Sequence, residues 1–300
     1  MAYYFQTKEI HLSQDFRIHT HDDKFFSKLR VSFLKKFFSL VKHQMLICGN
    51  VLLTGEYGYN VKDGQKITDG LTDVVIEEVK SYINSHHKKK IQSVLFKDFY
   101  VDQNWSRIQF DASRFTKVTV QPDMVVTIDK SWQTFGDYLS KVKSKYRVKF
   151  KKVLKKGSAL DFRILSHVEA NTYNEEMYNL YKATAERALF SLFLLDPHYF
   201  SRLKEELGDD MILYGVFLEN KLVGFFTFIK NGPLADAHFL GYDVSLNSKY
   251  QIYFNMLLKL LESAIEQKAS HLNLSRTALE IKSSVGAEPF DMSVYLRHEN

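Results

Sequence analysis

The sequence predicts an α/β fold with a mixed sheet, and the pattern of its last third carries this prediction. Three short apolar runs come first, each separated from the next by a polar turn, as in consecutive antiparallel strands. A helix-period run over 250–267 follows, and two more strands close the chain. Three paired strands followed by helix, strand, helix and strand require a crossover, and therefore a sheet with both parallel and antiparallel pairs. The strands are expected at 211–218, 222–230, 234–243, 271–275 and 293–297.

The N-terminal half is expected to repeat this theme. An apolar run over 45–55, a helical run over 69–90, a strand over 91–101 and an extended segment over 116–129, interrupted by Pro122, follow one another. Strand, helix, strand, strand is also the order found from 234 to the end of the chain. We therefore expect a second half of related fold, on element order alone. An amphipathic helix is further expected at 24–40, with an apolar stripe for the core.

A strand and two helices are expected in the second half, between the basic segment over 141–156 and the first of the three strands, at 211–218. Residues 160–166 alternate as a strand, and 174–190 have helical spacing. Asp196-Pro197 starts a further helix, because proline is favoured in a first turn.

Composition favours a globular cytoplasmic protein. Of the 300 residues, 45% are hydrophobic, and 24 Phe and 17 Tyr can fill a substantial core. Cys48 is the one cysteine, so no intrachain disulfide can form and a reducing compartment is expected. Lys8 and Glu9 stand where a signal peptide needs an apolar core. No apolar run approaches the roughly 20 residues of a transmembrane helix.

Positive charge is concentrated in one segment. Residues 141–156 contain eight lysines, one arginine and no acidic residue, so the charge of this segment is +9. The whole chain has a net charge of +6, and the rest of it therefore carries −3. Val142, Tyr146, Phe150 and Val153 or Leu154 form an apolar stripe that predicts an amphipathic helix. The cationic face is either solvated or an anion-binding surface for nucleotide phosphates, tRNA or an anionic membrane.

The C-terminal segment LNLSRTALEIKSSVGAEPF places Arg276, Lys282 and Gly286 between the last two strands. With the order of elements before it, this pattern resembles the GCN5-related N-acetyltransferases, and it is similar to the Fem-like peptidoglycan aminoacyltransferases. The aromatic residues from Trp132 and the basic segment with Arg147 resemble the helix that enters the second half of Fem-like proteins. The resemblance covers roughly 130–297.

This resemblance implies an acyl-CoA N-acyltransferase-like fold in two tandem halves. The expected divisions are a degenerate N-terminal half over 1–130, a basic connecting helix over 131–157 and a C-terminal acetyltransferase-like domain over 158–300. The implied reaction moves an acyl or aminoacyl group from acetyl-CoA, another acyl-CoA or an aminoacyl-tRNA to an amine. The acceptor class includes amino sugars, amino acids, peptides and amino lipids, such as cell-wall precursors.

The donor site implied by the resemblance is the start of the crossover helix, where free N–H groups attract pyrophosphate. In this chain it spans 244–251, and its candidate cofactor-binding residues are Ser245, Asn247, Ser248 and Lys249. The segment departs from the family pattern because it contains no glycine, so the backbone approaches a phosphate less easily. The serines and Asn247 also qualify as helix caps. The departure leaves the choice between CoA and aminoacyl-tRNA open.

Catalytic candidates lie at the end of the third strand: His238, Tyr242 and Asp243. Strand alternation predicts that His238 and Leu240 lie on one face of the strand and that Phe239 and Gly241 lie on the other. A histidine in an apolar strand is more commonly a hydrogen-bonded structural residue.

Further candidates come from the resemblance. The connection from Glu186 to Pro197 is expected to border the acceptor, which suggests Glu186 as a catalytic group and Arg187 and His198 as substrate ligands. Arg276 and Lys282 are expected to hold a carboxylate or phosphate, or to be surface cations on a short helix.

No metal site is expected, since the cluster around His19 and His21 lacks a second set of ligands. The alternative to an enzyme is a non-catalytic binding protein of this fold. It would dock nucleic acid or anionic membrane through the basic helix.

Overall fold

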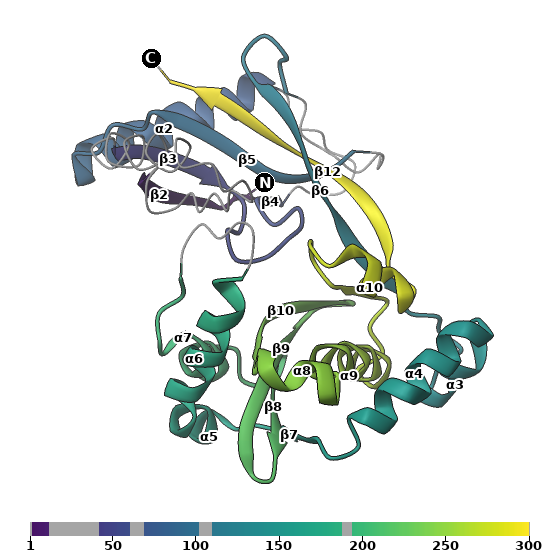
Figure 1. The fold of residues 1–300 in the computed structure, drawn as a ribbon. Coiled ribbons are helices and arrows are strands. Elements are labelled where there is room, and N and C mark those ends of the chain that lie inside the picture. Colours follow the sequence, from purple (N-terminus) through teal and green to yellow (C-terminus); the bar gives the residue numbers. More distant parts are fainter. Residues whose placement is uncertain (1, 12–41, 61–68, 102–109, 188–193, 300) are drawn as a thin grey trace, which may run out of the picture. The chain divides into compact units, whose positions relative to one another are not determined.

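The computed structural model describes residues 2–11, 42–60, 69–101, 110–187 and 194–299. They form two compact units, one made mainly of the chain up to Asp123 and from Phe290 on, the other mainly of the chain from Met124 to Pro289 (Figure 1). The expected helix over 24–40 and the cluster around His19 lie outside the described residues. None of the described helices is both long and apolar enough to cross a bilayer.

The first unit has a mixed sheet in the order β2-β3-β5-β12, with the crossover helix α2. Strands β3 and β5 are parallel, and β2 and β12 flank them antiparallel. Its core is centred on Leu46, Ile76 and Phe96, which are fully buried. The bounds are β2 Phe5–His11, β3 Lys42–Cys48, α2 Asp69–His87, β5 Ser93–Tyr100 and β12 Glu288–His298; a small ladder pairs β1 Ala2–Tyr3 with β4 Tyr59–Asn60.

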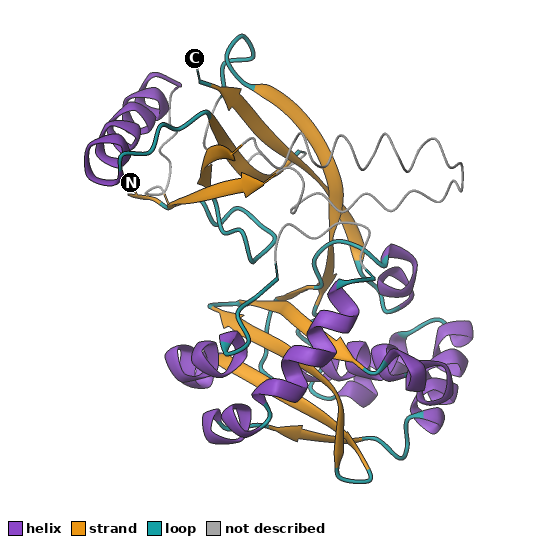
Figure 2. Ribbon diagram, turned by 60° about the vertical axis from the view of Figure 1, so that its left-hand side comes forward, coloured by secondary structure: helices purple, strands orange, loops and turns teal. Residues whose placement is uncertain are grey.

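The second unit has the strand order β6-β11-β10-β9-β8-β7. Strands β10 and β11 are its parallel pair, and the helix between them is the crossover. The strands are β6 Thr116–Thr127, β7 Asp161–Ile164, β8 Met211–Leu218, β9 Lys221–Asn231, β10 Leu234–Tyr242 and β11 His271–Asn273. Helices α5 to α7 lie on one side of this sheet, and α9 with α4 on the other (Figures 1 and 2). The helices are α3 Phe135–Lys141, α4 Ser144–Lys156, α5 His167–Thr172, α6 Asn174–Ala185, α7 Tyr199–Leu207, α8 Val244–Tyr250, α9 Ile252–Glu266 and α10 Leu279–Ser284.

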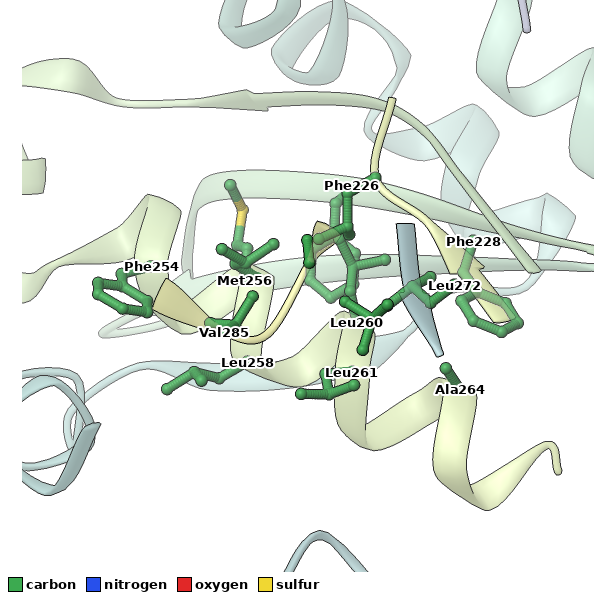
Figure 3. Packing of buried hydrophobic residues seen from close by; sticks show 14 of the residues in the cluster. Phe226, Phe228, Phe254, Met256, Leu258, Leu260, Leu261, Ala264, Leu272 and Val285 are labelled. Atoms are coloured by element: carbon green, nitrogen blue, oxygen red, sulfur yellow. The ribbon is translucent and has the colours of Figure 1, made fainter. Parts of the chain in front are cut away.

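The crossover helix packs as its periodicity predicts. Met256, Leu260, Leu261 and Ala264 are buried against the sheet (Figure 3). Leu257 is buried as well. The helix that the sequence predicts over 250–267 is confirmed as α9. A short helix, α8, precedes it, and Gln251 separates the two by adopting the left-handed conformation (φ 52°). The stripe of α4 is also confirmed, with Phe150 and Val153 buried and Leu154 exposed.

The predicted mixed α/β architecture with two related halves is confirmed, with one difference in pairing. In each unit an antiparallel strand follows the parallel pair, as in the repeat seen in the sequence. However, β6, the last strand of the N-terminal half of the sequence, pairs with β11 of the second unit. Conversely, β12, the last strand of the C-terminal half, pairs with β5 of the first unit. The expected interruption at Pro122 is wrong, since β6 is continuous through it.

Candidate functional site

The parallel strands of the second unit separate after a short ladder. Strands β10 and β11 pair over three residues, from Leu234 with His271 to Asp236 with Asn273. Strand β11 ends there, whereas β10 continues to Tyr242. From Ala237 onward, the backbone groups on this edge of β10 therefore form no ladder with β11. An opening of this kind offers backbone N–H and C=O groups to an extended ligand.

A β-bulge shapes β10 at the start of this opening. Its register with β9 shifts between Ala237 and Leu240. The buried Thr227 hydroxyl stabilises the bulge, since its Oγ1 accepts a hydrogen bond from the Phe239 N–H (2.9 Å) and donates one to the Phe239 carbonyl (3.0 Å). A bulge re-aims the side chains beside it.

The bulge overturns the alternation expected for this strand. The rings of both His238 and Phe239 contact Tyr199 of α7, with centroid distances of 5.8 Å and 6.2 Å. Consecutive residues of a regular strand point to opposite faces. The prediction that these two residues lie on opposite faces is therefore wrong, because a bulge adds a residue to the strand.

His238 and Tyr199 form a half-buried, neutral pair. The Tyr199 hydroxyl lies 2.6 Å from Nε2 of His238, and the tautomer decides which group donates. Burial lowers the pKa of His238 to about 4, and burial raises the pKa of Tyr199. Nδ1 of His238 is buried and has no hydrogen-bond partner among the described residues. A buried polar atom without a partner is rare in folded proteins and calls for an explanation.

The end of β10 lies against α6. The backbone N–H of Tyr242 donates to Oγ1 of Thr184, at 3.3 Å. Burial raises the pKa of the Tyr242 phenol, and the positive charge of Arg187 partly offsets this rise. The structure therefore brings Tyr242 and Arg187 close together. Glu186 is the exposed C-cap residue of α6, next to Arg187.

The start of the crossover is closed by its own side chains. Oδ1 of Asp243 caps α8 by accepting bonds from the N–H of Ser245 (2.9 Å) and from its hydroxyl (2.6 Å). Oδ1 of Asn247 accepts a bond from the N–H of Tyr253 in the first turn of α9 (3.0 Å). Ser248 and Lys249 are exposed. A carboxylate at a helix start fills the place that an incoming phosphate would need and repels it.

Lys282 is buried rather than exposed at the surface. Its side chain is 5% exposed, and Nζ donates to the carbonyl oxygens of Ser275 (3.2 Å) and Arg276 (2.5 Å). The alternative prediction that Lys282 is a surface cation is therefore wrong. Its ammonium holds a loop in which Ser275, Thr277 and Ala278 have positive φ. Strained backbone of this kind persists only where neighbouring groups enforce it.

His198 precedes α7 and is exposed, and its Nδ1 lies 3.0 Å from Nδ2 of Asn174. Much of the connection between Arg187 and His198 lies outside the described residues. No three His, Cys, Asp or Glu side chains converge as metal ligands within the described part of the chain.

Sequence reasoning missed Tyr199, Thr184 and Thr227. Tyr199 sits in the apolar pattern of a helix, which indicates core packing. Thr227 lies in the middle of an apolar strand, where only its isolated hydroxyl signals a role.

Comparison with solved structures identifies the fold. FemX superposes with a TM-score of 0.53 at 12% identity, covering 84% of this chain and 80% of that one. L-PGS from Bacillus licheniformis gives 0.52 at 11% identity, covering 86% and 77%. A tandem GNAT protein from the clavulanic acid biosynthesis pathway gives 0.52 at 11% identity, covering 85% and 75%.

No protein-family model matches the sequence. No curated protein matches it in sequence either. The likeness therefore concerns the fold, and its identities are too low to transfer a substrate. The chain has the fold of the GCN5-related, Fem-like acyltransferases, with a mixed sheet in each of its two units.

Proposed function

We propose that this protein is an N-acyltransferase that moves an acyl or aminoacyl group from an acyl-CoA or an aminoacyl-tRNA to an amine. The observation that carries the proposal is the opening between β10 and β11, where backbone groups from Ala237 onward are not used by β11. The folds of FemX and of a tandem GNAT protein support transfer chemistry of this class.

In the proposed reaction the amine nitrogen attacks the acyl carbonyl and forms a C–N bond. The negative charge on the carbonyl oxygen is stabilised by backbone N–H groups of β10. The tetrahedral intermediate then collapses, and the C–S bond of a thioester or the C–O bond of an ester breaks. The proton released by the amine is finally taken up by the leaving sulfur or oxygen.

Side chains at the end of β10 fit the proton transfers. The raised pKa keeps the Tyr242 phenol protonated at neutral pH, so it can donate to the leaving group. Glu186 is the exposed carboxylate at the end of the helix that packs on β10, and we assign it the role of base acting through water. His238, with a pKa of about 4, is too weak a base at neutral pH to take this proton.

The acceptor is expected to be an amine on an amino sugar, amino acid, peptide or amino lipid. The caps at Asp243 and Asn247 leave the start of the crossover poorly suited to a donor pyrophosphate. This arrangement favours a donor held mainly by its acyl arm in the opening.

The test is a transfer assay with the full chain. Acetyl-CoA, longer acyl-CoAs and aminoacyl-tRNAs are each mixed with a panel of amines, and the acylated amine is detected by mass spectrometry. Tyr242→Phe should lower the rate about 100-fold or more, whereas Tyr173→Phe, at the start of α6, should leave it unchanged. Absence of transfer from every donor by the folded protein would contradict the proposal.

A further inference from the structure

A cationic face lies along α4, on the side of the sheet occupied by α9 (Figure 1). Exposed lysines at spacings of four, three and four residues form one stripe of this helix, here called the lysine face: Lys145, Lys149, Lys152 and Lys156. They line a hollow of about 360 Å³, together with Val148 and with Gln251 at the α8–α9 junction. Because Val148 is 51% exposed, the helix presents an aliphatic side chain among the positive charges.

The charges of the lysine face are not neutralised by the described part of the chain. No described carboxylate lies at ion-pairing distance from these four lysines, and α4 contains no acidic residue. Lys145 and Lys149 instead lie over the rings of Tyr146 (4.7 Å) and Phe254 (4.8 Å). A stripe of cations without counter-charges maintains a positive potential that attracts an acidic partner.

The lysine face begins one short helix away from the opening beside β10. Strand β10 ends at Tyr242, α8 follows, and Gln251 after it already lines the hollow. The seven residues of α8 span about 10 Å. Asn255 holds this arrangement together, because its Nδ2 donates to the carbonyl oxygens of Val153 in α4 (3.2 Å) and of Gln251 (3.0 Å). A ligand on the lysine face therefore lies close to the end of β10.

The start of α8 discriminates between the two carriers of a pantetheine thioester. The Asp243 carboxylate occupies this helix start by accepting from the N–H of Ser245 (2.9 Å) and from its hydroxyl (2.6 Å). Coenzyme A would bring a diphosphate here, and the carboxylate would repel it. On a carrier protein the same arm ends in a single phosphodiester bonded to a serine, and the other contacts are made by the protein. The second carrier therefore suits this chain better.

We infer that the thioester donor of the acyl transfer proposed above, on which this inference rests, is presented by an acidic carrier protein that docks on the lysine face. Carboxylates of a carrier helix pair with the lysines, and an apolar side chain beside them packs on Val148. The phosphopantetheine arm passes α8 and enters the opening beside β10. There the amine nitrogen bonds to the acyl carbon, the C–S bond breaks, and the sulfur of the carrier takes up the proton that the amine releases.

The composition of α4 favours a protein partner over a bilayer or a nucleic acid. A helix that lies in a membrane surface inserts an apolar face, whereas the apolar face of α4 is buried in the core through Phe150 and Val153. A phosphate backbone offers no apolar contact to Val148, at the centre of the exposed face. An acidic protein helix supplies both carboxylates and aliphatic side chains, so it matches both features of the surface.

The docking test measures binding of a fluorescently labelled acidic acyl carrier protein by the full chain, using anisotropy at several salt concentrations. Binding should weaken as salt rises, because exposed charges are screened. Lys152→Gln/Lys156→Gln should weaken it roughly tenfold or more, because two charge-assisted contacts are lost. Lys151→Gln/Lys155→Gln is the matched control, since it removes the same charge from positions of α4 that do not line the hollow. It should leave most of the binding intact.

The transfer test compares one acyl group on the carrier protein and on coenzyme A, with the same amine. The carrier-bound donor should have a kcat/KM at least about tenfold higher, because docking contacts lower KM. Lys152→Gln/Lys156→Gln should reduce kcat/KM for the carrier-bound donor and leave that for acyl-CoA unchanged.

Absence of carrier binding at low salt, equal losses for the two lysine pairs, tighter binding of tRNA or anionic vesicles than of the carrier, or equal kcat/KM for the two donors would each overturn the inference. All of these results are compatible with transfer from acyl-CoA, so they are distinguishable from failure of the proposed reaction.

Discussion

Gly241 of β10 and Tyr181 of α6 are in backbone contact. A Cβ on Gly241 would lie 2.4 Å from the backbone nitrogen of Tyr181, closer than any side chain can approach. The absence of a side chain at this position lets α6 reach the strand, so that Thr184 accepts the Tyr242 N–H and Arg187 lies near the Tyr242 phenol. One glycine therefore sets the distance between the two elements of the candidate site.

Gly241→Ala should destabilise the protein by about 3 kcal/mol, because the opposing atoms are backbone and cannot rotate away. Thermal or denaturant unfolding measures the loss. Gly136→Ala is the control, since a Cβ there would meet only Oγ1 of Thr134 at 3.4 Å, an ordinary contact. If both variants kept wild-type stability, the close approach of α6 to β10 would be wrong.

The stability of the protein should depend on pH through His238. Its folded pKa of about 4 lies below the ordinary value of 6.5. The unfolded chain therefore binds the proton first, and stability is complete above pH 6.5 and falls as the pH drops toward 4. The contribution lost between pH 6.5 and 5 is about 2 kcal/mol.

Comparison with His238→Gln isolates the contribution of His238 to this pH dependence, because glutamine can still form a hydrogen bond with Tyr199 but does not titrate. Denaturant unfolding at several pH values should show a shallower pH dependence for the variant over that window. Parallel curves for the two proteins would show that His238 is solvated.

Asn255→Ala should cost about 2–3 kcal/mol, because it removes the amide whose two N–H groups are shared among three carbonyl oxygens at the junction of α4 and α9. Amide hydrogen exchange should also become faster at the start of α9. Gln267→Ala, at the exposed end of the same helix, is the control and should change stability by less than about 0.5 kcal/mol. Unchanged stability of Asn255→Ala would show that Asn255 does not hold α4 against the junction of α8 and α9.

Lys282→Met keeps most of the buried side chain and removes its ammonium. The carbonyl oxygens of Ser275 and Arg276 then lose a charged donor, so unfolding should become about 2–3 kcal/mol easier. Lys221→Met at the exposed start of β9 should have little effect. If Lys282→Met had wild-type stability but bound the donor more weakly, Lys282 would be a ligand-binding residue and not a structural one.

The elements of the second unit could be predicted from the sequence because their signals are local. The strands β8 to β10 follow apolar runs and turns, and α9 buries the residues that its period selects. The break at Gln251 has no such signal, since glutamine rarely adopts a left-handed conformation.

The geometry of the site was less predictable because it depends on contacts between distant residues. The bulge that turns His238 toward Tyr199 depends on Thr227, a residue of the neighbouring strand. The burial of Lys282 depends on the fold of the loop after β11. Of the two caps, only that of Asn247 was among the alternatives that residue types suggest, whereas Asp243 was expected as a catalytic candidate and caps α8.

The central claim is that the donor lies in the opening between β10 and β11. Hydrogen exchange of the β10 amides, with and without acetyl-CoA, longer acyl-CoAs or aminoacyl-tRNA, tests it most directly. A donor that supports transfer should slow exchange within Ala237–Gly241 and leave Leu234–Asp236, already paired with β11, unchanged. A donor that supports transfer without protecting Ala237–Gly241 would contradict the account.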